Sequence, residues 1–75
     1  MATAFLLLNT VTGQEAEVVN GLKKLKEVKE AHLTDGSYDV IAHMETETMG
    51  ELKDAVNWKV RHLESVRSIL TMIVV

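Results

Sequence analysis

The sequence repeats one small pattern, and this repeat limits the folds open to it. A helical stretch runs into an alternating strand over 24–33 and again over 62–71, with Leu-x-x-Val at both junctions. A further strand precedes each unit, at 4–9 and at 38–45. The order is therefore βαβ-βαβ, and 75 residues hold one domain, 1–75. We predict an α+β, ferredoxin-like βαββαβ plait with a four-stranded antiparallel sheet.

Composition and charge exclude several classes of protein. There is no cysteine, so neither a disulfide nor a thiolate metal site can form. The apolar run 5–8 is too short for a signal peptide or for the roughly 20 residues of a membrane span. The net charge of −3 argues against direct nucleic-acid binding. These features predict a soluble, cytoplasmic protein that contacts neither membrane nor nucleic acid.

Two strands are apolar on both faces, which predicts a dimer. Segments 5–8 and 69–75 lack the polar alternation of a strand with one solvated face. Two helices can cover only one side of a four-stranded sheet. We therefore expect a second copy of the chain to pack on the other side, sheet to sheet.

Both helices have recognisable starts and apolar stripes. Thr12–Glu15 and Thr48–Glu51 each fit the Thr-x-x-Glu capping box. The stripes are Val18, Val19, Leu22 and Leu25 in the first helix, and Met49, Leu52, Ala55, Val56, Val60 and Leu63 in the second. Gly21 predicts a close packing contact within the first helix. Trp58 lies off the stripe, either as part of a second contact surface between dimers or folded over the core edge.

Asp35-Gly36 between two alternating runs predicts a tight hairpin. In that register Leu33 faces Tyr38, and His32 faces Asp39. One strand face then carries Ala31, Leu33, Tyr38, Val40, Ala42 and Met44, and we expect the helices to cover it. The other carries Glu30, His32, Asp39, Ile41 and His43.

No arrangement of residues predicts catalysis, a cofactor or a metal ion. In the tight-hairpin register His32 and His43 lie about four pairs apart, roughly 13 Å, which is too far for shared metal ligation. The serines lack a glycine-flanked nucleophile elbow. The loop Thr34–Asp39 is more informative, because amide donors and a carboxylate could together bind a small zwitterion. Its simplest interpretation is a turn that needs Gly36 for positive φ.

This loop carries a family resemblance that extends over the whole chain. Gly36–Asp39 (Gly-Ser-Tyr-Asp) resembles the Gly-x-Tyr-Asp signature of the effector (RAM) domain of Lrp/AsnC-type transcription regulators. Further similar segments are Thr12–Glu15 at the first helix, Val28–Ala31 at the second strand, and Leu63–Val66 with Thr71 at the last strand. The regulators' helix-turn-helix is absent from the 75 residues, so the chain resembles a stand-alone RAM protein.

The resemblance implies a function and a set of binding residues. The resemblance implies a sheet-to-sheet homodimer that assembles further into a higher oligomer. An amino-acid effector is implied to bind where dimers meet, and a full-length regulator of the family is a possible partner. The implied ligand-binding residues are Thr34, Gly36, Ser37, Tyr38, Asp39 and Thr71. We therefore expect an amino-acid sensing and oligomerisation module, not an enzyme.

Three alternatives share the predicted topology. If the chain were a dimeric α/β-barrel enzyme, the purified protein would show a flavin-, haem- or quinone-dependent activity. An ACT-like amino-acid domain would bind through the turn Asn9–Gly13, so that substitution of Gly13 rather than Asp39 would abolish binding. A purely structural assembly module would bind no ligand.

Overall fold

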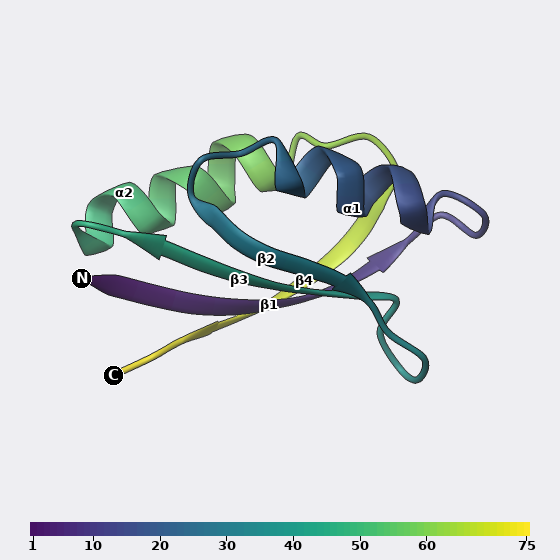
Figure 1. Cartoon of the computed structure of the whole chain (residues 1–75), viewed down its shortest axis with the longest axis horizontal. Helices are drawn as coiled ribbons and strands as arrows, with labels where there is room; N and C mark the ends of the chain where they lie inside the picture. The colour runs from purple at the N-terminus through teal and green to yellow at the C-terminus, as the bar shows by residue number, and fades with distance from the viewer.

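Four strands, two α-helices and one π-helix follow one another in the computed structural model, which describes all 75 residues (Figure 1). In chain order they are β1 (Ala2–Thr10), α1 (Glu15–Lys23), β2 (Val28–Leu33), β3 (Val40–Thr46), α2 (Met49–Asp54), the π-helix η1 (Ala55–Val60) and β4 (Val66–Ile73). The strands pair antiparallel in the order β2-β3-β1-β4. The predicted ferredoxin-like plait is confirmed.

The core lies between one face of the sheet and the helices (Figure 1). β1 is central, and alternate residues such as Ala4, Leu6 and Leu8 are fully buried. Val40, Ala42 and Met44 of β3 face the same side. Alternate residues of the two central strands therefore form the side of the sheet that packs against the helices.

The predicted helical stripes are confirmed except at their ends. Val18, Val19 and Leu22 are buried in α1, and Leu52, Ala55, Val56 and Val60 are buried along α2 and η1. Leu25 and Leu63 are partly buried against this core, and Met49 stays exposed. Gly21 does mark a close contact, because a Cβ there would lie 3.2 Å from a methyl carbon of Leu63.

Of the two predicted capping boxes, only the one at α2 supplies a side-chain cap to the helix. The Thr48 hydroxyl accepts a hydrogen bond from the Glu51 amide at 3.2 Å. At α1 the prediction of Thr12 as the cap was wrong, since Gln14 precedes the helix and no side chain caps it. Gly13 turns the chain with a φ of +89°, which leaves Thr12 upstream of the first helical turn.

The predicted register of the β2–β3 hairpin was wrong by two residues. Leu33 pairs with Val40, and His32 pairs with Ile41 rather than with Asp39. A six-residue loop replaces the tight turn, because the amide and the carboxylate of Asp39 bind β1. A two-residue shift keeps each side chain on its face, so Ala31, Val40, Ala42 and Met44 are buried as expected. Leu33 lies on that side but is 58% exposed.

The helices leave the second side of the sheet uncovered, and we call it the open face. Pairing across the strands brings Phe5 beside His43 and Met72, and Leu7 beside Ile41 and Leu70. Phe5, Leu70 and Met72 are 38%, 44% and 48% exposed. The open face therefore presents an apolar centre, as the two-sided apolar strands predicted.

Candidate functional site

The loop that joins β2 to β3, residues 34–39, is closed by hydrogen bonds from both of its ends. The Thr34 amide donates to the Asp39 carbonyl at 2.9 Å. The Thr34 hydroxyl donates to the Tyr38 carbonyl at 2.6 Å. Two predicted binding residues, Thr34 and Asp39, thus define the shape of the loop.

Asp39 also ties this loop to the central strand. Its amide donates to the Leu8 carbonyl at 2.9 Å, and its Oδ2 accepts from the buried Thr10 amide, also at 2.9 Å. The Thr10 hydroxyl lies 3.5 Å from the same oxygen. Oδ1 accepts no hydrogen bond within the chain, so one oxygen of the carboxylate remains available to a ligand.

The tip of the loop is open to solvent. Gly36 has a φ of +153°, where residues with a side chain are strained, and no atom lies within 4 Å of where a Cβ would be. The exposed Ser37 hydroxyl makes no hydrogen bond within the chain, and Tyr38 is half-buried. Gly36, Ser37, Tyr38, Thr34 and Asp39 are therefore brought together, with unused polar groups at the tip.

Thr71 lies apart from this loop. Leu6 pairs with Thr71 on one side and with Ala42 on the other, which places Thr71 two strands from β3, roughly 10 Å. Thr71 points to the helix-covered side and lines a cleft of about 200 Å³ between β4 and the segment α2–η1. The remaining lining residues are Leu52, Lys53, Val56, Asn57, Arg61 and Ile73.

We call this space the Thr71 cleft, and it is suited to an anion with an apolar part. Lys53 and Arg61 are exposed and make no ion pair within the chain. Leu52 and Val56 form an apolar floor. Sequence reasoning missed the two cations. Their eight-residue spacing is compatible with one helical stripe, but only tertiary packing shows that this stripe borders β4.

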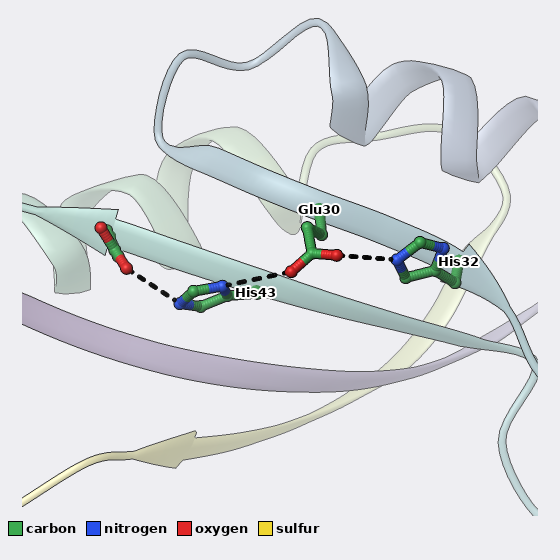
Figure 2. A network of polar contacts seen from close by, with 4 residues as sticks. Glu30, His32 and His43 are labelled. Atoms are coloured by element: carbon green, nitrogen blue, oxygen red, sulfur yellow. Dashed lines mark hydrogen bonds and ion pairs between the residues drawn. The ribbon is translucent and has the colours of Figure 1, made fainter.

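A polar network on the open face was also missed (Figure 2). Glu30 lies between two imidazoles, with its Oε1 3.2 Å from His32 Nε2 and its Oε2 3.9 Å from His43 Nδ1. The predicted separation of the two histidines was wrong, because the true register pairs Glu30 with His43. No group of three or more such side chains in the chain is arranged to hold a metal ion.

An ion pair joins the turn before β2 to η1. Lys59 Nζ lies 2.6 Å from Oε2 of the buried Glu27. The hydrogen bond from Lys59 lowers the pKa of Glu27, although burial of the carboxylate opposes this shift.

Trp58, next to Lys59 in the sequence, is 69% exposed, with its ring centre 5.9 Å from that of His62. The ring therefore does not fold over the core edge.

Comparison with known proteins gives a consistent result over the full chain. A model of the Lrp/AsnC ligand binding domain matches residues 3–75. The HTH-type transcriptional regulator FL11 of Pyrococcus abyssi is 32% identical over 71 residues, which make up 95% of this chain and 46% of FL11. The chain thus spans about half the length of this curated relative. No helix of the chain is both long and apolar enough to cross a membrane.

Solved structures show the same fold. Hypothetical protein PHS023 from Pyrococcus horikoshii superimposes with a TM-score of 0.95 at 39% identity, covering 100% of this chain and 90% of that one. The regulator NMB0573 from Neisseria meningitidis, solved as a complex with L-Met, has a TM-score of 0.84 at 16% identity. That likeness covers 99% of this chain and 49% of the regulator.

Proposed function

The chain belongs to the Lrp/AsnC ligand-binding domain family, and from that premise we propose that it is an amino-acid sensing and oligomerisation module. The family is one of transcription regulators, not of enzymes. A role in small-molecule sensing is consistent with this membership. The amino acid as effector, its binding residues and the assembly are our proposals, as is action in the cytoplasm, where transcription regulators work.

The observation that carries the proposal is a pair of incomplete half-sites of opposite charge. The 34–39 loop offers the unused Oδ1 of Asp39 and the unused Ser37 hydroxyl. The Thr71 cleft offers Lys53 and Arg61. An amino acid carries both an ammonium and a carboxylate, which these two half-sites complement.

The half-sites are too far apart to act together within one chain. The strand order separates Thr71 from the loop, so a small zwitterion can reach both only if they come from different copies. We place the ligand at a contact between dimers, where it bridges the loop of one copy and the cleft of another. A ligand that bridges two dimers favours the assembled state through its higher affinity for that state.

The dimer itself would form through the open face. Its exposed apolar side chains, Phe5, Leu70 and Met72, lie on adjacent strands and would be removed from water by a second sheet. The exposed Trp58 provides a candidate for a second contact between dimers. A full-length regulator of the family is a further candidate partner, and co-purification of a tagged chain from cell extract tests that association.

A thermal-shift screen against the standard amino acids tests ligand binding. At about a hundredfold its dissociation constant, a ligand adds about 2.7 kcal/mol of stability. We expect a shift with one or a few amino acids. Asp39→Asn, which keeps an acceptor for Thr10 but removes the charge, should lose the shift, as should Thr71→Val.

Asp35→Asn is the matched control, since it removes an exposed charge from the same loop. It should respond like the wild type. A folded dimer that responds to no amino acid would instead indicate an assembly module without a ligand. Loss of the shift in Gly13→Ala but not in Asp39→Asn would move the site to the turn after β1.

A further inference from the structure

The open face carries a connected set of ionisable groups, which we call the Glu–His network (Figure 2). It consists of Glu30, His32, His43 and Glu45. Glu30 contacts both imidazoles, and Nε2 of His43 lies 3.2 Å from Oε2 of Glu45. His43 is thus held between two carboxylates, one on β2 and one on its own strand.

Apolar groups surround this network on the side toward the sheet centre. The His43 ring stacks on Phe5 of β1 at 5.0 Å, with an angle of 16° between the planes. Phe5, Ile41 and Ala42 line a hollow of about 150 Å³ together with Glu30, His32 and His43. The network therefore borders the apolar centre of the open face and would be covered with it.

No other charged side chain on the strands forms an ion pair with the Glu–His network. On the open face, β1 contributes Thr3, Phe5 and Leu7, and β4 contributes Ser68, Leu70 and Met72, none of them charged. Two lysines and three further carboxylates share a hollow with Glu45, and none of them forms an ion pair with a network member: Lys26, Lys29, Glu27, Glu47 and Glu51. The net charge of the network consequently depends on its histidines.

Histidine is the side chain whose charge ordinarily changes between about pH 5 and pH 8. With both imidazoles neutral, the two carboxylates leave each network with two negative charges. With both protonated, each network is neutral and internally paired. When two sheets pack together, two negatively charged networks, one per copy, lose hydration without gaining an opposite charge, which is unfavourable. A neutral, internally paired network is buried at lower cost.

We infer that proton binding to the Glu–His network strengthens sheet-to-sheet association, so that the assembly responds to pH as well as to a ligand. This inference rests on the dimer of the proposed function. The dimer binds more protons than two separate copies do, and its dissociation constant therefore falls as pH falls. Each proton taken up per dimer contributes up to about tenfold per pH unit.

Sedimentation velocity of a fluorescently labelled chain, diluted until it dissociates, measures this dissociation constant at about pH 8 and about pH 5.5. We expect at least about tenfold tighter association at the lower pH in the wild type. His43→Gln should abolish most of this dependence. Glu30→Gln, at an exposed position that the fold does not need, should also flatten it and strengthen the dimer at high pH.

His62→Gln is the matched control, because His62 contacts Trp58 on the helical side instead of the open face. It should keep the wild-type pH dependence. A dimer whose dissociation constant is equal at both pH values, or whose pH dependence persists in both His43→Gln and Glu30→Gln, overturns the inference and leaves the dimer intact. A chain that is monomeric at every concentration overturns the proposed dimer itself.

Discussion

Asp39 serves the fold with one carboxylate oxygen and is free to bind a ligand with the other. Oδ2 accepts a hydrogen bond from the amide of Thr10, the buried last residue of β1. Asp39→Ala would leave this amide without a partner, and we expect a loss of about 1–3 kcal/mol in the free energy of unfolding. Asp39→Asn should cost much less. Urea unfolding at one fixed protein concentration measures both, and equal losses would show that the bond to Thr10 is unimportant.

Glu27 should make the protein sensitive to acid. Its pKa in the folded state is lowered by the hydrogen bond from Lys59, so its contribution to stability is present above about pH 4.5 and is lost as pH falls through the lowered value. Glu27→Gln should cost about 1–2 kcal/mol at neutral pH and lose less stability on acidification. Urea unfolding across this range measures the difference, which a parallel pH profile in the two proteins would contradict.

At the scale of elements, the two Thr-x-x-Glu segments make a matched pair for the energetics of capping. The Thr48 hydroxyl caps α2, whereas Thr12 makes no side-chain hydrogen bond at α1. Thr48→Ala should therefore destabilise the protein by about 1 kcal/mol, and Thr12→Ala by only a few tenths. Thermal unfolding measures both changes. Equal destabilisation by the two substitutions would mean that the α1 box also forms in solution.

Local patterns predicted the elements but not their connections. The stripes of α1 and α2 and the alternation in β1 and β3 follow from burial with a fixed period, which the sequence displays directly. The hairpin register depends on Asp39 reaching Leu8 and Thr10, residues about thirty positions away. The Glu–His network was missed for this reason, because it exists only in the true register.

In the candidate site too, local sequence patterns predicted one part, and contacts between distant residues determine the other. Gly36 to Asp39 are adjacent in sequence, so their grouping needed no tertiary information, and the need of Gly36 for positive φ is confirmed. Thr71 shares no such proximity, and the structure places it in a different cleft with Lys53 and Arg61. The π-helix η1, which continues α2 beside this cleft, has no signature in the helical stripe.

For the whole molecule, the open face should determine whether two copies associate. Leu70→Lys places a charge at the centre of this face, where covering it without a partner is costly. We expect this variant to be a monomer. Val11→Lys, at a position with nearly the same exposure (43% against 44%) but in the β1–α1 turn, should remain a dimer. Light scattering coupled to gel filtration distinguishes the two, and a dimeric Leu70→Lys would locate the interface elsewhere.

On the proposed mechanism, an amino acid changes the assembly of this chain by joining half-sites from different copies. Sedimentation velocity of the wild type, with and without a saturating mixture of the standard amino acids, tests it most directly. We expect dimers without ligand and a larger, faster-sedimenting assembly with it, and this increase should disappear in Asp39→Asn. An unchanged sedimentation coefficient would contradict ligand-driven assembly.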